Sequence, residues 1–127
     1  MSQEPDGYHF FLCPNCHRIS TRWFVRGTGE IYIVWKVDRF GEIHYEEINA
    51  HPKLHFICKM TICPKCGKDF IKYGNSFLIK IYRKDLYIEP VGTYWTHFLL
   101  KNPQEFQRIL NKVKSQFVNL LERGELK

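Results

Sequence analysis

The amino-acid sequence predicts an α+β fold, with an antiparallel β-sheet formed by most of the chain and one long helix at the C-terminal end. The chain has 127 residues, a size that fits a single domain. Hydrophobic residues make up 44% and aromatic residues 16% of the sequence, which supplies a core and favours strands. Near the C-terminal end, apolar residues instead recur at steps of three and four, as on one face of a helix.

The β-rich part is expected over residues 8–100, after a loose tail at residues 1–7. Within it we expect strands at residues 8–12, 19–25, 30–37, 42–49, 54–62, 69–73, 77–82 and 86–89. Turns are expected near Gly27, Gly41 and Gly74, because glycine adopts the backbone conformations that tight turns need. Residues 90–96 show no clear pattern.

The last element is predicted as a helix over residues 102–123. Asn102 can cap it, Pro103 suits its first turn, and Glu105 complements the positive end of the helix dipole. Its apolar stripe consists of Phe106, Ile109, Leu110, Val113, Phe117, Leu120 and Leu121. We expect this stripe to cover the sheet. The alternative is a dimer interface, since part of the stripe alternates steps of four and three as in a coiled coil.

Two Cys-x-x-Cys pairs are the strongest functional signal. In each pair, proline follows the first cysteine and favours a tight turn that aims two thiolates at one point. Two such turns supply four sulfur ligands, the closed tetrahedral shell typical of structural zinc. We therefore predict one structural Zn²⁺ ion, bound by Cys13, Cys16, Cys63 and Cys66. The chain has five cysteines, an odd number that favours metal binding in a reducing compartment over disulfides.

The two motifs read Cys13-Pro14-Asn15-Cys16-His17 and Cys63-Pro64-Lys65-Cys66-Gly67. They resemble the zinc-ribbon and zinc-knuckle families, in which Cys-Pro-x-Cys-Gly occurs twice, each time at the tip of a β-hairpin. The resemblance covers residues 8–25 and 54–73. The second motif fits fully, whereas the first has His17 where glycine is common, and the spacer of 46 residues is long enough to hold an inserted hairpin at residues 30–49. Ribbons of this kind occur in transcription, translation and RNA-processing proteins, and also as structural staples.

Other interpretations use the same cysteines. Rubredoxins bind iron for electron transfer with the same doubled pattern, although their chains are shorter and acidic. Cys58 precedes the second pair with the spacing of plant-type ferredoxins, but no fourth cysteine follows it. Thioredoxin-like dithiol chemistry needs a βαβ context that neither pair has. Cys58 or His17 is also a candidate to replace one of the four ligands.

No catalytic residues are predicted. The six histidines are scattered and lack the HExxH spacing of a hydrolytic metal site. Four thiolates leave no open coordination position at the metal, and the sequence contains no glycine-rich phosphate loop. We therefore expect a non-enzymatic protein without a small-molecule substrate.

Positive charge is concentrated around the second cysteine pair. The net charge is +6, and residues 51–84 contain eight Lys or Arg against one Asp. Interleaved aromatic residues there suit base stacking, while the cations suit phosphates. The candidate nucleic-acid contacts, on adjacent candidate strands and near the first pair, are Lys65, Lys68, Lys72, Lys80, Arg83, Lys84, Arg18, Arg22 and Arg26. The competing interpretation is that the aromatics form core and the lysines protect strand edges.

The sequence thus favours a zinc-binding adaptor that binds nucleic acid or a ribonucleoprotein machine, of the transcription, translation or RNA-processing type. The alternative is a protein–protein interaction module, dimeric through residues 103–123. No apolar run approaches the ~20 residues that cross a bilayer, and the N-terminal residues lack a secretory pattern. A cytoplasmic protein without a membrane partner is therefore expected.

Overall fold

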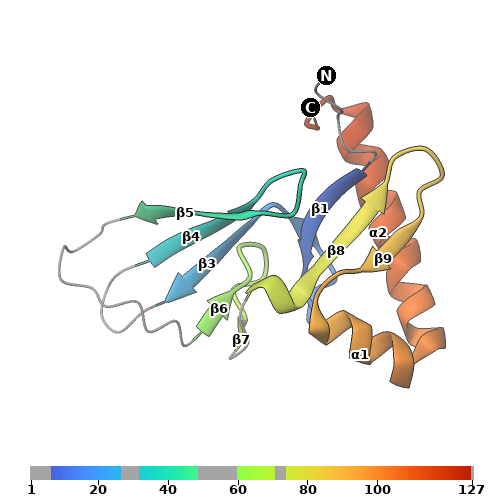
Figure 1. Ribbon diagram of the computed structural model, residues 1–127, viewed down its shortest axis with the longest axis horizontal. Helices are drawn as coiled ribbons and strands as arrows, with labels where there is room; N and C mark the ends of the chain where they lie inside the picture. The colour runs from blue at the N-terminus through green and yellow to red at the C-terminus, as the bar shows by residue number, and fades with distance from the viewer. Residues whose placement is uncertain (1–6, 27–31, 49–59, 71–73, 127) are drawn as a thin grey trace.

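Two antiparallel sheets and two α-helices form the part of the chain that the computed structural model describes, residues 7–26, 32–48, 60–70 and 74–126 (Figure 1). The four-stranded sheet has the order β2-β1-β8-β9 and the five-stranded sheet the order β5-β4-β3-β6-β7. The strands are β1 (Gly7–Leu12), β2 (Ile19–Ser20), β3 (Arg22–Arg26), β4 (Tyr32–Val37), β5 (Ile43–Ile48), β6 (Met60–Ile62), β7 (Asp69–Phe70), β8 (Leu78–Tyr82) and β9 (Ile88–Pro90). The helices are η1 (Gly74–Phe77, a 3₁₀ helix), α1 (Thr93–Lys101) and α2 (Pro103–Glu122).

Strand β1 lies at the centre of the core and is buried along its whole length. Alternate side chains of a strand point to opposite faces of a sheet. Accordingly, Tyr8 and Phe10 pack against Phe117 of α2, with ring centroids 5.6 and 6.0 Å apart. Phe11 faces the other way and meets Trp23 of β3 at 5.6 Å. The strand therefore joins the helix layer to the five-stranded sheet.

Helix α2 covers the four-stranded sheet, as the apolar stripe predicted (Figure 1). Its buried side chains are Phe106, Ile109, Val113 and Phe117, spaced by three and four residues on one helical face. Each of these side chains is at most 2% exposed. The other three residues of the stripe, Leu110, Leu120 and Leu121, are partly buried against the same core.

The prediction of a single sheet is wrong, because the chain changes sheets at Thr21. The predicted strand at residues 19–25 is divided there into β2 and β3. The Ser20 Oγ atom accepts a hydrogen bond from the Arg22 backbone N–H at 3.1 Å, a local contact that stabilises a bend. Beyond the bend, Trp23 is fully buried and stacks on Phe77 at 5.4 Å. Burial of this indole ring between the two sheets explains the change of direction.

Helix α1 falls where the sequence showed no clear pattern. Its N-cap is Gly92, which offers no side-chain cap, so the usual start signal is missing. Glycine is needed there, since a Cβ atom would collide with the backbone of Asn75 and Ser76. Trp95 of this helix is fully buried.

The inserted hairpin is confirmed as β4 and β5, which pair from Val37↔Ile43 to Tyr32↔Ile48. Of the predicted strands at 54–62 and 69–73, the structure contains β6 and β7, and the remaining residues of both lie outside the described ranges. No helix in the described part of the chain has the length and apolar character that a membrane span requires.

Candidate metal centre

The four predicted cysteines come together at the junction of the two sheets. Their ligand atoms all lie within 4.8 Å of one another. The Sγ atoms of Cys13 and Cys66 are 3.7 Å apart, and those of Cys16 and Cys63 are 3.8 Å apart. Four sulfurs placed tetrahedrally at about 2.3 Å from one ion are separated by about 3.8 Å, whereas a disulfide bond is about 2.05 Å long. The arrangement therefore suits a single metal ion held by four thiolates.

Two loops with the same hydrogen bonds present these sulfurs. In the first knuckle (residues 13–18), the His17 N–H donates to the Cys13 carbonyl at 3.0 Å and the Cys13 N–H donates to the Arg18 carbonyl at 3.0 Å. In the second knuckle (residues 63–68), the same two bonds run from Gly67 to Cys63 and from Cys63 to Lys68, at 2.9 and 3.2 Å. The repeated Cys-Pro-x-Cys motif thus produces a repeated backbone.

Backbone amides in each knuckle point at the first sulfur. The N–H groups of Asn15 and Cys16 approach the Cys13 Sγ atom at 3.4 Å, and the N–H of Lys65 approaches the Cys63 Sγ atom at 3.4 Å. Such donors favour the thiolate form. They orient both sulfurs and stabilise the negative charge that a metal ligand must carry.

The thiols also influence one another. The contact with Cys13, together with the surrounding amides, lowers the pKa of Cys63 to about 5 despite burial. The same contact, followed by burial, raises the pKa of Cys13. A bound metal ion would favour deprotonation of all four cysteines.

The backbone conformation explains why His17 can stand where glycine is common in the zinc-ribbon motif. His17 and Gly67 occupy equivalent positions, with positive φ angles of 60° and 74°. Glycine adopts this left-handed conformation freely, whereas other residues lose roughly 1–2 kcal/mol, and histidine is among those found there more often. Within the described ranges the sulfur cluster consists of the four cysteines, and His17 is not part of it. Cys58 lies outside those ranges.

Helix α2 anchors the first knuckle through Gln116, a contact that the sequence analysis missed. The Gln116 Nε2 atom donates to the His17 carbonyl at 2.6 Å, and its Oε1 atom accepts from the Ile19 N–H at 2.9 Å. Just before the knuckle, the Trp95 Nε1 atom donates to the Leu12 carbonyl at 3.1 Å. Gln116 directly precedes the buried Phe117. This position beside the apolar stripe is the only feature of the sequence that could have indicated its contact with the first knuckle.

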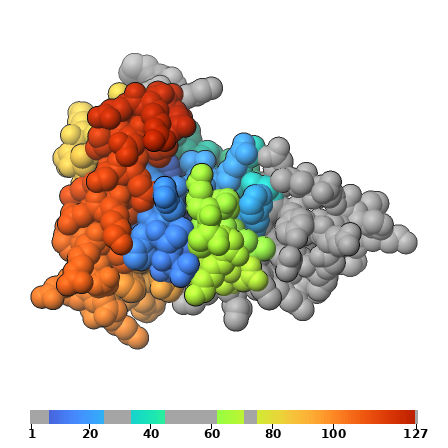
Figure 2. Space-filling view, turned by 180° about the vertical axis from the view of Figure 1, so that it is seen from behind, coloured from blue at the N-terminus to red at the C-terminus, as the bar shows by residue number. Residues whose placement is uncertain are grey.

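The second knuckle is much more exposed. Cys63 is buried, but Lys65, Cys66, Gly67 and Lys68 are exposed. In Figure 2 the second knuckle, in green, lies directly beside the first knuckle, in blue. The first knuckle lies between the second knuckle and α2, which is orange and red. Apart from the sulfur contacts, a side-chain bond from the Asn15 Nδ2 atom to the Cys66 Sγ atom, at 3.6 Å, links the two knuckles.

The predicted basic residues come from several separate elements. Lys65 and Lys68 lie on the second knuckle, the loop between β6 and β7 of the five-stranded sheet, whereas Lys80 lies on β8 in the other sheet. Arg83 and Lys84 follow the end of β8 that pairs with Gly7, while the first knuckle follows the opposite end of β1. Arg18 and Arg22 lie in and just after the first knuckle. Lys72 and the side chain of Arg26 lie outside what the structure describes.

The aromatic residues interleaved with the candidate lysines are Phe70, Tyr73, Phe77 and Tyr82, of which Phe77 belongs to the buried core and Tyr73 lies outside the described ranges. Phe77 is 1% exposed, and the half-buried Phe70 packs against both Phe77 and Trp23, with centroid distances of 5.4 and 6.0 Å. Tyr82 packs on Tyr87 and receives the Lys80 ammonium group over its ring at 4.6 Å. Phe77 is therefore not available to stack on bases.

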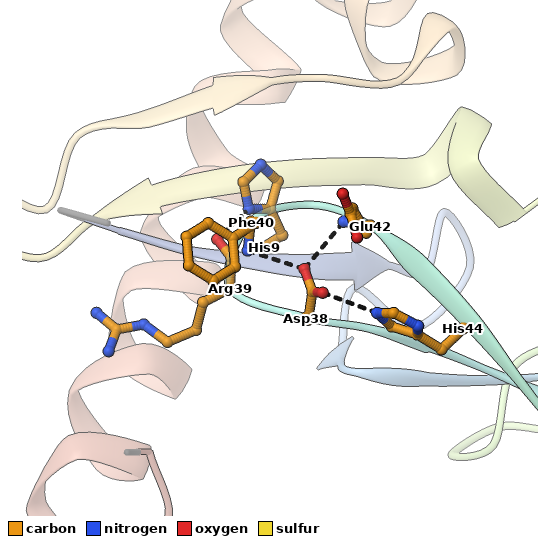
Figure 3. A network of polar contacts seen from close by, with 6 residues as sticks. All are labelled: His9, Asp38, Arg39, Phe40, Glu42 and His44. Atoms are coloured by element: carbon orange, nitrogen blue, oxygen red, sulfur yellow. Dashed lines mark hydrogen bonds and ion pairs between the residues drawn. The ribbon is translucent and has the colours of Figure 1, made fainter. Parts of the chain in front are cut away.

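A second group of ligand-type side chains, Asp38, Glu42 and His44, lies at the β4–β5 turn (Figure 3). The Asp38 Oδ1 atom accepts from the N–H groups of Phe40 and Glu42 at 2.9 and 3.0 Å, and its Oδ2 atom contacts the His44 Nε2 atom at 2.8 Å. These contacts outweigh partial burial and lower the pKa of Asp38. The carboxylate thus stabilises the turn, and the group carries no further assignment.

The same turn docks on the four-stranded sheet. The Arg39 carbonyl lies 2.9 Å from the Nδ1 atom of buried His9 (Figure 3). A Cβ atom at Gly41 would lie 2.8 Å from the His9 Nε2 atom, so the turn fits closely over this imidazole ring. Burial lowers the pKa of His9.

Comparison with known proteins found no matching family model, no matching curated protein and no matching solved structure.

Proposed function

We propose that the four cysteines bind one zinc ion as the structural centre of a zinc-ribbon-type site. The supporting observation is the pair of sulfur separations, 3.7 and 3.8 Å, which match the tetrahedral geometry of a Zn–S₄ site. Four thiolates close the coordination shell and leave no position for a substrate or water. The ion would therefore act as a staple rather than as a catalyst.

The staple would join parts of the chain that are distant in sequence. Strand β1 of the four-stranded sheet leads into Cys13, and β6 of the five-stranded sheet leads into Cys63. Strand β6, which leads into the second knuckle, pairs with β7 through two residue pairs and with β3 through three. Zinc would add a link between the sheets, beside the chain at Thr21 and the packing of Phe11 on Trp23.

We further propose that this zinc-stapled protein is a non-enzymatic adaptor that binds nucleic acid. The observation that supports it is the exposure of Arg18, Lys65 and Lys68 on the two knuckles, in a protein of net charge +6. Exposed cations on a rigid loop attract phosphates and give binding that weakens with salt. The alternative of dimerisation through α2 is less favoured, because four of the seven residues of its apolar stripe are buried in its own chain and the other three are partly buried.

The test is direct binding of labelled RNA and DNA oligonucleotides to the metal-loaded protein across a salt series. We expect binding at low salt and a steep linear fall of log affinity with log salt concentration. Absence of binding to both oligonucleotides at low salt would contradict the adaptor function. It would leave the metal assignment to be decided by metal analysis.

A further inference from the structure

A cleft of about 400 Å³ lies between the first knuckle, the second knuckle and the C-terminal end of α2. Figure 2 shows these three segments, in blue, green and red, on the same face of the molecule. The side chains that give the cleft its chemistry are Arg18, Ser20, Thr21, Lys65, Asn119 and Arg123. Its volume is in the range of small-molecule sites, about 300–1,000 Å³.

Positive charge dominates the lining. Arg18, Lys65 and Arg123 come from three separate segments, and Glu125 is the one carboxylate among the lining residues. Glu125 lies 4.0 Å from Arg123. Within the described ranges no carboxylate pairs with Arg18 or Lys65. Three cations against one carboxylate leave the cleft with an excess of positive charge, which attracts anions.

Hydrogen-bond donors accompany these cations. The Ser20 Oγ atom already accepts from the Arg22 N–H, so its own proton remains available to donate. Thr21 and Asn119 add a hydroxyl and an amide from exposed positions. Oxygens of a phosphate group only accept hydrogen bonds when ionised, and this lining supplies mainly donors.

The cleft offers nothing for a nucleobase to stack on. Phe10 is the one aromatic residue among the lining side chains, and it is 1% exposed. Stacking of a base on an aromatic side chain needs an accessible aromatic face. The cations and donors of the cleft therefore suit phosphate contacts better than aromatic stacking.

A neighbouring cavity adjoins the cleft and shares Thr21, Glu125 and Leu126 with it. Its lining contains the cations Arg22, Lys36 and Arg39 together with the carboxylates of Asp38 and Glu125. The positive charge is therefore more concentrated in the cleft itself.

We propose that this cleft, formed by Arg18, Lys65 and Arg123, is a phosphate-binding site that holds the backbone of a nucleic-acid strand. The proposal rests on the proposed adaptor function and names the surface that performs it. The same chemistry would accept a free polyphosphate, and the experiment distinguishes the two sources.

The experiment compares two variants of equal net charge. The cleft variant combines Arg18→Gln, Lys65→Gln and Arg123→Gln. The control combines Arg83→Gln, Lys84→Gln and Lys101→Gln, at exposed positions that do not line the cleft. Each variant removes three charges, so the net charge falls from +6 to +3 in both. Metal content and circular dichroism verify that both variants remain folded.

Binding of single-stranded RNA and DNA 12-mers is measured by fluorescence anisotropy across a salt series, and binding of pyrophosphate by calorimetry. For the cleft variant we expect at least about a tenfold loss of oligonucleotide affinity and a salt slope smaller by about 2, from three lost contacts at about 0.7 each. The control should lose less than about threefold.

Each other outcome has a defined meaning. If the control loses as much affinity as the cleft variant, or more, the assignment of the cleft as the phosphate-binding site is overturned, and the proposal of nucleic-acid binding stands. If the wild type binds pyrophosphate through the cleft residues but neither oligonucleotide, the phosphate site stands and the adaptor function fails. If the wild type binds none of the three probes, both proposals are overturned.

Discussion

The two cysteine knuckles have nearly the same backbone but very different surroundings. The first follows the fully buried strand β1 and is tied to α2 through both polar atoms of the Gln116 amide. The second follows the three-residue strand β6 and is exposed from Lys65 to Asp69. The first knuckle is thus tied to the core and to α2, whereas the second is tied to the rest of the chain by β3, by Phe70 and by the sulfur cluster. We therefore expect a bound ion to order the second knuckle more than the first.

The largest expected effect comes from breaking the link between the knuckles. Cys63→Ser removes one of four sulfur ligands from the buried side of the cluster. We expect loss of the bound metal and a fall in the free energy of unfolding of about 4 kcal/mol or more, as for other lost metal sites. Metal analysis and urea unfolding measure the two effects.

The matched control is Lys65→Gln, in the same loop but with an exposed side chain. Hydrogen exchange should show loss of protection at residues 60–70 in Cys63→Ser, with residues 7–12 still protected. A Cys63→Ser protein that keeps a fully protected second knuckle without metal would refute the structural role of the ion.

A smaller effect is expected from releasing the first knuckle. Gln116→Met keeps the size of the side chain but leaves the Ile19 N–H and the His17 carbonyl without their present partner. Two lost hydrogen bonds should lower the free energy of unfolding by about 2 kcal/mol. Asn119→Ala, one turn further along α2 and exposed, is the control and should change it by less than about 0.5 kcal/mol. Equal effects of the two substitutions would remove the argument for anchoring by Gln116.

The backbone of the second knuckle gives a more delicate test. Gly67 has a φ of +74°, and a Cβ atom there would meet nothing within 4 Å. Gly67→Ala should therefore cost about 1 kcal/mol of unfolding free energy through conformation alone. Gly67→Asn should cost less, because asparagine tolerates the left-handed region. If both variants unfold at the same urea concentration as the wild type, the two knuckles do not share the conformation described.

The smallest effect concerns the cleft that both knuckles border. Glu125 supplies the one carboxylate of its lining. Glu125→Gln should raise oligonucleotide affinity about threefold at low salt, because it removes a like charge near the bound phosphate at an exposed position. Glu122→Gln, on the last turn of α2 and outside the cleft lining, should raise it less. Unchanged oligonucleotide affinity in Glu125→Gln would indicate that the phosphate binds outside this cleft.

Local motifs predicted the metal site better than they predicted the fold. The Cys-Pro-x-Cys motif contains the information for its own turn, so the four cysteines could be grouped from their spacing alone. The change of sheet at Thr21 could not be predicted, because it depends on the distant Phe77, against which Trp23 packs. Helix α1 was missed because Gly92 is selected by contact with Asn75 and Ser76 rather than for helix capping.

The basic residues illustrate the same limit. Lys68 and Lys80 are close in sequence, yet Lys68 lies in the loop between β6 and β7 of one sheet and Lys80 lies on β8 of the other. Arg18, Lys65 and Arg123 are far apart in sequence, yet they line one cleft. Arg123 had no signal of its own, since its place in the cleft follows from how α2 packs on β1 and β2.

X-ray absorption of the protein purified under reducing conditions tests the central claim most directly. The zinc edge should report one zinc ion per chain with four sulfur ligands at about 2.3 Å, and the protein should be colourless. A coloured protein with iron in an S₄ shell, a zinc shell with nitrogen or oxygen ligands, or a folded protein without metal would contradict the account.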